Sequence, residues 1–525
     1  MNRLVWLIWD AASYNLVDLL IKENKLLNLQ SVLKKGTGIP VLINRYNTQT
    51  PYALAVQFTG KLGNKLNMGG YYTPRFKGKK EELLNYDISF KNKNVKKYLF
   101  WKQKIFKNKF ISLGQIPYYD ENQNNYRFID GFSKKIYSRQ LLYSSKLDWT
   151  NIEEDKRKTV INIFNKKIEI IESNNINIYE IYDCNSKKSL FVEKDSYIGK
   201  DYWIDNTSGC KIFIFSIDND VLFFFSDVFK YSTKNIEINE SFRKELGVFF
   251  GIAYGRLYRT SCFGTPYYSG GNKLAEKIFM CLLKEVSNYF ERLSLFLMKF
   301  NDDINIFYNP CIDEISHELF GHWQNSYEED KSYYWQLISE CYNYADNHLG
   351  SILKKLDRSD VISISSDHGI CAVDTSFYIN SYFLKKNIIS IKDDKVDINN
   401  SKLFYHSSNT GALFSLVPKF KNLVFLKELK SLTFNNRKVI KKIIIFKKRT
   451  VFGDYYIIPE KGIYLDPSFK DVIFESTNKI GCHTINTEDE FLKAIFFVNT
   501  KLKSKNIKNT HMIKILKKIV RSKLC

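Results

Sequence analysis

The sequence predicts an α/β protein with a mostly parallel sheet, flanking helices and a β-rich insertion. Apolar runs of strand length alternate with amphipathic helical segments over residues 1–75 and again over 271–525, a rhythm typical of parallel strands joined by helices. Roughly residues 76–235 carry short alternating runs separated by polar turns instead. We therefore divide the chain into the first part of an α/β core, 1–75, the insertion, 76–235, and the second part of the core, 236–525.

The first part of the core begins with a buried strand, "RLVWLIW", at residues 3–9. A helix is expected at 14–29 and a second strand, "GIPVLI", at 38–43. Another helix should follow Thr50. Pro51 suits the first position of a helix, so the residue before it is the expected N-cap.

The insertion is rich in Tyr, Phe, Ile and Asn. Its expected strands are "KIEIIES", "NIYEIYD", "SLFVEK", "KIFIFSI" and "VLFFFSDVF". Polar turns of a few residues separate these runs, which favours antiparallel pairing.

The second part of the core resumes the alternation. Long amphipathic helices are expected at 272–300 and 332–356, with strands at 304–308 and 360–366. The chain ends with "HMIKILKKIVRSKLC", which predicts a basic amphipathic helix docked on the surface, with membrane contact as the lesser alternative.

The chain of 525 residues is strongly basic, with 79 Lys and Arg against 56 Asp and Glu and a formal charge of +23. Such a balance favours an anionic partner, which could be a nucleotide, a phosphate ester, nucleic acid or a membrane surface. The lysines are scattered, however, in clusters such as "KGKK" that are typical of solvated faces. The charge therefore gives no firm support for nucleic acid or membrane binding.

Nine cysteines without a CxxC pair do not form the pattern of a disulfide framework. No apolar stretch has the length needed to span a membrane. The N-terminal "MNRLVWLIWDAAS" is similar to a signal peptide, but Asp10 ends the apolar run early, so we interpret it as a strand. We expect a cytoplasmic protein.

Acidic residues and histidines cluster beside the predicted strands. Asp10 ends the first strand, and "VISISSDHG" places Asp367 and His368 at the end of another. "INIFYNPCIDEISH" brings Asp313 and, four residues later, His317. His483 lies shortly before the apolar run "AIFFV". Ligands of open α/β sheets bind beyond the carboxyl ends of the strands, where these side chains should project.

Each of these residues has an ordinary structural alternative. An Asp after a strand is often a helix N-cap, an Asp and a His four apart can form a surface pair, and a single His is often structural. Their conjunction favours a metal site, because carboxylates and imidazoles suit zinc or a related divalent ion. Three Asp, three His and one Thr hydroxyl are too many ligands for one tetrahedral zinc and suit two ions sharing a site.

Thr50 has two interpretations. Its hydroxyl could only cap the helix that follows, or it could be a nucleophile placed at the positive end of that helix. Thr48 and Ser13 are the competing nucleophiles. Ser13 follows Asp10 too closely to reach across the site, and Thr48 lacks the cap position. With the metal-type ligands considered, we favour Thr50 as the nucleophile.

These motifs resemble, in their order, the type I phosphodiesterase/nucleotide pyrophosphatase family of the alkaline phosphatase superfamily. The matching stretches are "WLIWDAAS", "TQTPYALAVQFTGK", "DEISHELFG", "SDHG" and "GCHTINTEDEFLKAIFFV". The resemblance covers roughly 1–75 and 300–500, and is looser over the insertion, where "DSYIGKDYWIDNTSGCKIFIFSI" is similar to bacterial and archaeal members. It implies an alkaline-phosphatase-like fold.

The resemblance also implies two metal ions, usually zinc. One would be held by Asp313, His317 and His483. The other would be held by Asp10, Asp367 and His368, with Thr50 contacting it as the nucleophile that forms a phospho-threonine intermediate. The implied substrate is a small phosphorylated molecule, a nucleotide or another phosphodiester.

Two departures concern the substrate more than the metals. Nucleotide-active members often have Asn shortly after the Thr, where this chain reads "TPYALA", and the usual "HG" after "TGK" is missing. A sulfatase would need Cys or Ser at position 50, and a phosphomutase would use Ser. A non-catalytic protein that binds phosphorylated ligands is a further alternative, although the intact ligand set argues against it. Of the other histidines, we expect His322 to face away from the site and His406 to be structural.

Overall fold

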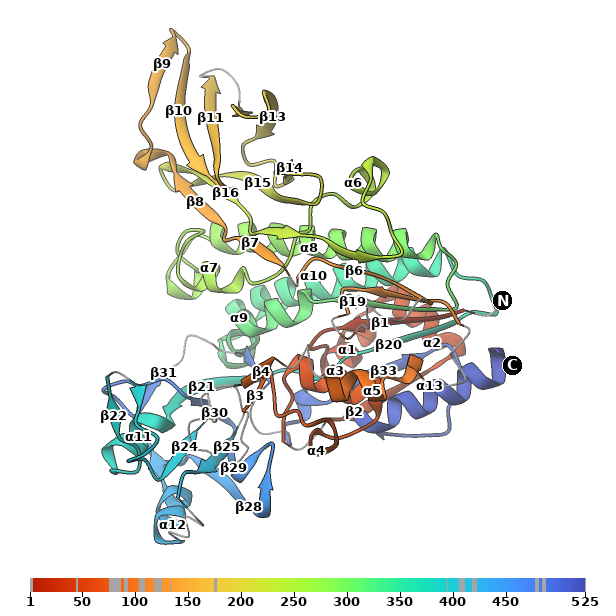
Figure 1. Cartoon of the computed structure of the whole chain (residues 1–525), viewed down its shortest axis with the longest axis vertical. Helices are drawn as coiled ribbons and strands as arrows, with labels where there is room; N and C mark the ends of the chain where they lie inside the picture. The colour runs from red at the N-terminus through yellow and green to blue at the C-terminus, as the bar shows by residue number, and fades with distance from the viewer. Residues whose placement is uncertain are drawn as a thin grey trace.

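The computed structural model describes most of the chain. The described residues are 3–43, 46–74, 86–88, 93–102, 109–116, 118, 125–132, 134–173, 177–393, 395–405, 411–417, 423–476, 481–483 and 488–524. A central sheet forms the middle of the molecule, helices cover its two faces, and β-rich lobes extend from it in opposite directions (Figure 1).

The central sheet has nine strands within the described ranges. In spatial order they are β18 (Ser232–Lys234), β6 (Tyr126–Asp130), β5 (Ile111–Gly114), β19 (Ile304–Asn309), β1 (Leu4–Trp9), β20 (Val361–Ser365), β33 (Ala494–Val498), β2 (Thr37–Leu42) and β34 (Ile507–Lys508). Only β33 and the edge strand β18 run against the others, so the predicted mostly parallel sheet is confirmed. Strands β1, β19 and β20 are completely buried, as expected for strands covered on two faces.

Long helices pack on the sheet through their apolar stripes. On one side, α8 (Leu274–Met298) lies against β19 and β5, and α10 (Glu328–Leu353) packs on α8. On the other side, α3 (Thr50–Thr59) packs against α13 (Asn509–Leu524) (Figure 1). The remaining helices are α1 (Tyr14–Lys22), α2 (Leu27–Lys35), α4 (Gly63–Leu66), α5 (Lys93–Tyr98), α6 (Glu240–Leu246), α7 (Gly255–Arg259), α9 (Cys311–Asn325), α11 (Ile379–Lys385) and α12 (Leu423–Ser431). Of the helices that the structure describes, none combines the length and apolar character needed to cross a membrane.

The predicted helix at 14–29 is wrong in one respect, because it is two helices. Helix α1 ends at Lys22, and Asn24 then adopts a left-handed conformation with φ of 57°, a common helix terminator. The carboxylate of Asp346 accepts hydrogen bonds from the backbone N–H groups of Asn28 and Leu29, at 2.9 and 2.8 Å. This contact from a distant helix fixes the start of α2, and the local sequence pattern does not predict that start.

The expected antiparallel strands within 76–235 form two sheets. One consists of β13 (Lys188–Glu193), β12 (Ile178–Asp183), β11 (Lys166–Ser173), β10 (Lys156–Ile163) and β9 (Thr150–Glu153). The other consists of β7 (Lys135–Tyr137), β17 (Val228–Lys230), β15 (Ser208–Ile217), β16 (Asp220–Phe225) and β8 (Gln140–Tyr143), with β14 (Lys200–Trp203) beside β15. Three strands of the same range, β5, β6 and β18, pair within the central sheet instead.

A second β-rich lobe, which we did not expect, follows β20. One of its two larger sheets contains β30 (Gly462–Asp466), β21 (Cys371–Tyr378), β31 (Phe474–Ser476) and β32 (Gly481–Cys482). The other contains β24 (Leu403–Tyr405), β25 (Ala412–Ser415), β29 (Gly453–Pro459) and β28 (Ile440–Thr450). Short pairs are β22 (Ile391–Lys392) with β23 (Lys395–Val396), β26 (Thr433–Phe434) with β27 (Arg437–Lys438) and, elsewhere, β3 (Tyr72–Pro74) with β4 (Tyr86–Ile88). Strand β32 pairs antiparallel to β21, so this lobe returns the chain toward the core just before His483.

Candidate metal centre

Two predicted ligand positions lie where adjacent parallel strands end. Trp9 of β1 pairs with Asn309 of β19, and Ile8 pairs with Ser365 of β20. Asp10, directly after β1, is held by a hydrogen bond from its N–H to the carbonyl of Asn309, at 3.0 Å. The register therefore brings Asp10 beside the chain that leaves β20 toward Asp367 and His368.

The turn after β20 requires a glycine. A Cβ atom on Gly369 would lie 2.1 Å from the carbonyl oxygen of Phe491, so only glycine fits the "SDHG" turn there. After β1, Ala11 has φ of 56°, and its N–H donates to the carboxylate of Asp367 at 3.3 Å. Such strained backbone is concentrated at functional sites, and here it links the two aspartates.

Helix α9 and strand β32 provide the second half of the site. Asp313 and His317 lie one turn apart on α9. Strand β32 approaches this helix so closely that a Cβ atom on Gly481 would lie 1.9 Å from the carbonyl of Ser316. His483 follows β32 directly, and its ring lies 5.1 Å from that of His317 and stacks on that of His368 at 3.8 Å.

All three histidines are oriented in the same way. The Nδ1 atoms of His317, His368 and His483 contact the carbonyls of Gly481, Gly369 and Thr48, at 2.6, 3.0 and 3.2 Å respectively. A carbonyl oxygen can only accept, so each Nδ1 donates and carries a proton. This arrangement leaves Nε2 of each ring directed at the site, which is the orientation that a metal ligand needs.

These Nε2 atoms face carboxylates rather than donors. His317 Nε2 lies 3.3 Å and His483 Nε2 lies 3.9 Å from Oδ1 of Asp313. His368 Nε2 lies 3.1 Å from Oδ2 of Asp367 and 3.5 Å from Oδ1 of Asp10. Two acceptors can face one another at such distances only if a proton or a cation lies between them.

The carboxylate oxygens at these contacts lack hydrogen-bond partners. Oδ1 of Asp10, Oδ1 of Asp313 and Oδ2 of Asp367 are buried and accept no hydrogen bond from the part of the chain that the structure describes. An unsatisfied buried carboxylate costs several kcal/mol, roughly, unless it is paired or holds a metal. These residues therefore fit divalent metal ions, and their nitrogen and oxygen donors suit zinc.

The shifted pKa values of Asp10 and Asp313 reflect the negative charge that gathers at the site. Burial, and then the charges of Asp367 and Asp313, raise the pKa of Asp10 well above its ordinary value. Burial would also raise the pKa of Asp313, but the histidines beside it, His317 first, hold that pKa below its ordinary value. Without a cation, the site must bind protons to remain stable.

The ligand atoms form two overlapping groups. Asp313, His368 and His483 make one group and Asp10, Asp367 and His368 the other, each with ligand atoms within 4.8 Å of one another. His368 belongs to both, and His317 joins the first group through its contact with Asp313. Two overlapping groups of candidate ligands thus lie side by side and are mostly buried.

Thr50 lies at this volume, at the start of α3. Its Oγ1 atom is 3.3 Å from Nε2 of His368, and only 7% of the residue is exposed. The expected capping role is wrong, because Gln49 is the N-cap and its carbonyl accepts from the N–H of Ala53 at 2.9 Å. Thr50 is the first helical residue, so its hydroxyl is not used for capping.

The competing hydroxyls have other positions. Thr48 donates its hydroxyl hydrogen bond to the carbonyl of His483, which clamps the loop before α3 onto the second half of the site. Ser13 lies beyond β1, and its N–H donates to the hydroxyl of Tyr342 at 3.2 Å. Among the described contacts of these three candidates, only the hydroxyl of Thr50 reaches the side chain of a predicted ligand, whereas Thr48 reaches a backbone carbonyl.

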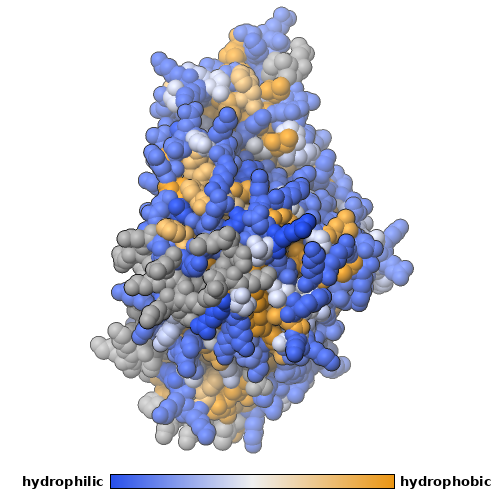
Figure 2. Space-filling view, turned by 90° about the vertical axis from the view of Figure 1, so that its right-hand side faces the viewer, coloured by the Kyte–Doolittle hydropathy of each residue, from blue (hydrophilic) through white to orange (hydrophobic). Residues whose placement is uncertain are grey.

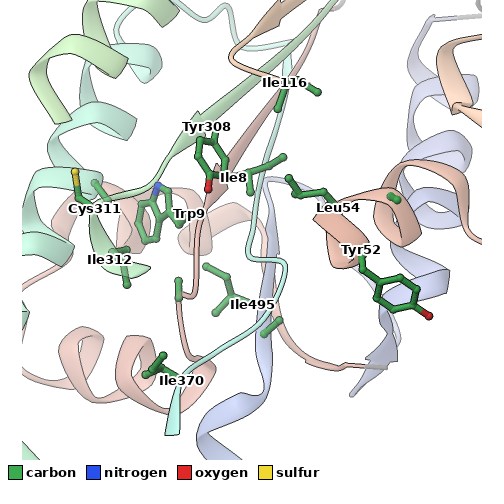
Figure 3. Close-up of a cluster of buried hydrophobic side chains, with 14 of the residues drawn as sticks. Ile8, Trp9, Tyr52, Leu54, Ile116, Tyr308, Cys311, Ile312, Ile370 and Ile495 are labelled. Atoms are coloured by element: carbon green, nitrogen blue, oxygen red, sulfur yellow. The ribbon is translucent and has the colours of Figure 1, made fainter. Parts of the chain in front are cut away.

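Two tyrosines of the site, Tyr308 and Tyr71, were not predicted from the sequence. Tyr308, at the end of β19, donates a hydrogen bond to Oδ2 of Asp10. Figure 3 shows it near Trp9 and Ile312 in a cluster of buried hydrophobic side chains. The side chain of Tyr71 hydrogen-bonds that of Thr50, and nearby carboxylates, Asp10 first, add to the burial that raises its pKa. Their signal was weak: one ends an apolar run and the other lies in a loop.

His322 lies away from the site, as expected. Its ring stacks on Tyr268 at 4.3 Å and on Tyr334 at 5.2 Å, and burial lowers its pKa to about 4. His406 lies outside the described residues.

Residues 263–483 match the sequence profile of the family described as type I phosphodiesterase / nucleotide pyrophosphatase. The matched range includes Asp313, His317, Asp367, His368 and His483, whereas Asp10 and Thr50 precede it. The resemblance that the motifs predicted is thereby confirmed. No curated protein sequence matches the chain significantly.

Solved structures with a similar fold include phosphonoacetate hydrolase from Sinorhizobium meliloti 1021, with a TM-score of 0.51 at 9% identity over 97% of this chain and 94% of that one. Murine ectonucleotide pyrophosphatase / phosphodiesterase 5 has a TM-score of 0.45 at 11% identity, over 99% and 95% of the two chains. The alkaline phosphatase PafA has 0.46 at 12%, over 99% and 96%. The first likeness shows the fold alone, and the predicted alkaline-phosphatase-like α/β fold is confirmed.

Proposed function

Because residues 263–483 match the type I phosphodiesterase/nucleotide pyrophosphatase family, we propose that this chain is a two-metal phosphoric ester hydrolase. It acts as a phosphodiesterase or nucleotide pyrophosphatase on a small phosphorylated substrate and forms a phospho-threonine on Thr50. The family match supports the hydrolase class. We propose in addition that two ions bind, that both are zinc, and that Thr50 is the nucleophile.

The observation that carries the proposal is the arrangement of the three histidines. Each directs Nε2 toward a buried carboxylate oxygen that has no hydrogen-bond donor among the described residues. A purely structural cluster would supply donors to these oxygens. Asp313, His317 and His483 would hold one ion, and Asp10, Asp367 and His368 the other.

Bound divalent ions supply positive charge at the phosphoryl group and lower the pKa of a nearby hydroxyl or water. The chain itself positions the nucleophile. The hydroxyl of Thr50 attacks phosphorus, the bond to the leaving alcohol breaks, and the phosphoryl group is carried on Thr50. Water then cleaves the new ester, which releases the phosphate product and restores the hydroxyl.

The N-terminus of α3 adds to this chemistry. Backbone N–H groups there favour negative charge on the Thr50 oxygen and on a phosphoryl group. Tyr71 is fixed at the same place, since its N–H donates to the side chain of Gln49 at 2.9 Å. Its neutral phenol is suited to hydrogen-bond the Thr50 oxygen or a phosphoryl oxygen.

A sulfatase or a phosphomutase remains a weaker alternative, because position 50 is Thr rather than Cys or Ser.

We also propose that the protein is located in the cytoplasm.

The test combines metal analysis with activity. We expect about two zinc ions per purified chain and hydrolysis of bis(p-nitrophenyl) phosphate in preference to p-nitrophenyl phosphate. Hydrolysis of p-nitrophenyl sulfate instead would favour the sulfatase alternative. Full metal loading without hydrolysis of any of these esters would favour a non-catalytic phosphate-binding protein.

A further inference from the structure

A second concentration of charge lies at the opposite end of α3 from Thr50. Here the C-terminal end of α3, helix α5 and helix α13 line a half-open cavity of about 260 Å³. Five lysines line it: Lys61, Lys97, Lys102, Lys514 and Lys517. Within the described part of the chain, no Asp or Glu lines it.

The cavity joins two segments that are far apart in the sequence and free of acidic residues. Residues 88–119 contain eight lysines and no Asp or Glu. Residues 491–525 contain nine lysines, one arginine and again no Asp or Glu. The scattered charge elsewhere in the chain does not explain why residues 97–102 of the first segment and 513–517 of the second line one cavity.

The positive charges in this cavity repel one another. Burial, and then the charges of Arg521, Lys61 and Lys514, lower the pKa of Lys517. No ion pair with a described carboxylate involves Lys61, Lys97, Lys514 or Lys517, whereas many lysines elsewhere have such a pair. The C-terminal end of the α3 dipole accommodates one nearby cation, but not all four of these lysines.

The helices at this cavity are fixed by packing, so the lysines cannot simply separate. Met512, Ile513 and Leu516 of α13 are buried. Gly60, which ends α3 with φ of 66°, lies so close to α13 that a Cβ atom there would be 3.0 Å from the side chain of Ile513. The surface on the side of the molecule where the chain ends lie is largely hydrophilic (Figures 1 and 2).

We propose that this lysine cavity is a binding site for a small, multiply charged phosphate anion such as pyrophosphate, separate from the metal centre. Several lysines lining one half-open cavity fit a compact oligophosphate, and its binding offsets their repulsion. The cavity is too small for an extended polymer to be enclosed. The inference does not depend on the proposed hydrolase activity, because it uses none of the metal-centre residues.

The test is isothermal titration of the purified full-length chain with pyrophosphate at constant ionic strength. We expect the triple variant Lys61→Gln, Lys514→Gln, Lys517→Gln to bind at least about tenfold more weakly at this site, which corresponds to about 1.4 kcal/mol. The matched control is Lys167→Gln, Lys188→Gln, Lys200→Gln, which removes three exposed lysines from the insertion and should bind as the wild type does.

Pyrophosphate could also bind at the metal centre, so the same titrations are made in an Asp367→Asn background. Binding that persists in that background and is lost only with the cavity lysines supports the proposal. Equal binding by the triple variant and the wild type, with both folded by circular dichroism, would overturn it. Equal loss in the control triple would also overturn it, as an effect of net charge alone.

Two further probes separate the sources of phosphate. Vesicles of phosphatidylcholine and phosphatidylglycerol test a lipid headgroup, and a single-stranded oligonucleotide tests a polymer. Loss of vesicle or oligonucleotide binding in the triple variant, with pyrophosphate binding unchanged, would overturn the assignment to a small anion.

Discussion

The Oγ1 atom of Thr50 lies 3.3 Å from Nε2 of His368, although 318 positions separate the two residues. One begins a helix on one face of the sheet, and the other follows a central strand. This contact places a hydroxyl against the proposed metal ligands at the positive end of a helix. It is the relationship on which the catalytic part of the proposal depends.

Thr50→Ala should abolish turnover while bound metal is retained. The variant removes the proposed nucleophile but none of the six carboxylate and imidazole ligands. We expect the hydrolysis rate of bis(p-nitrophenyl) phosphate to fall by at least about 10³-fold, the order seen when a residue acting in the transition state is lost. Metal content measured by mass spectrometry should stay near the wild-type value.

Thr48→Ala is the matched control for this experiment. It removes a hydroxyl two residues away that only holds the loop to the carbonyl of His483. We expect about tenfold loss of rate or less. If Thr50→Ala and Thr48→Ala lose equal activity, Thr50 is not the nucleophile.

Asp367→Asn should have opposite effects on stability with and without metal. In the metal-free chain the substitution removes one of three mutually repelling buried carboxylates, so the melting temperature should rise. In the metal-loaded chain it removes a ligand, so the melting temperature should fall. Each effect should be on the order of 2 kcal/mol in the free energy of unfolding.

The measurement is thermal unfolding of both proteins with excess zinc and with a chelator. A shift of the same sign in both conditions would show that Asp367 has an ordinary structural role. Ser365→Ala, at the end of β20 two residues before Asp367 but with its side chain toward Trp6, provides a control that should not respond to the chelator.

Tyr308→Phe should weaken metal binding. Its hydroxyl donates to Oδ2 of Asp10 and so orients the other oxygen of that carboxylate toward His368. Loss of such a supporting hydrogen bond typically lowers metal affinity or activity about 10–100-fold. Competition with a fluorescent zinc chelator would measure the affinity, and an unchanged value would exclude an orienting role.

Tyr71→Phe should instead lower the rate and leave metal affinity unchanged. Tyr71 contacts Thr50 rather than a metal ligand, so its hydroxyl can be removed without removing a metal donor. We expect the kcat for the diester to fall about tenfold, as for loss of one hydrogen bond made in the transition state. Equal weakening of metal binding would show that its role is structural.

Much of the core could be predicted because its strands are continuous apolar runs with a polar residue at the end. That pattern alone placed Asp10 and Asp367 at one edge of the sheet, where β1 and β20 do end together. The four-residue spacing of Asp313 and His317 predicted one helix face for the same local reason.

The remaining features depend on contacts between distant residues. The N-cap of α3 moved to Gln49, since the loop before it is held by His483, more than 400 positions away. The break between α1 and α2 depends on Asp346, and the role of Tyr308 depends on Asp10. None of these partners can be recognised from the local pattern of the segment that it fixes.

His348 should make the protein less stable in mild acid. It is completely buried on α10, where its Nδ1 contacts the amide of Asn309 at 3.3 Å and its Nε2 contacts the hydroxyl of Ser294 at 2.8 Å. Burial lowers its pKa from 6.5 to about 3. Between pH 6.5 and about 3 the unfolded chain therefore binds more protons at this residue than the folded chain does.

The free energy of unfolding should consequently fall as the pH drops through this window, by up to about 1.4 kcal/mol per pH unit from this residue. His348→Gln removes the titrating group and retains a donor and an acceptor, so its stability should depend less on pH between 6.5 and 4. Urea denaturation at several pH values measures the difference from the wild type. His511→Gln, an exposed position on α13, should leave the wild-type dependence unchanged, and an equal flattening in that variant would contradict the assignment to His348.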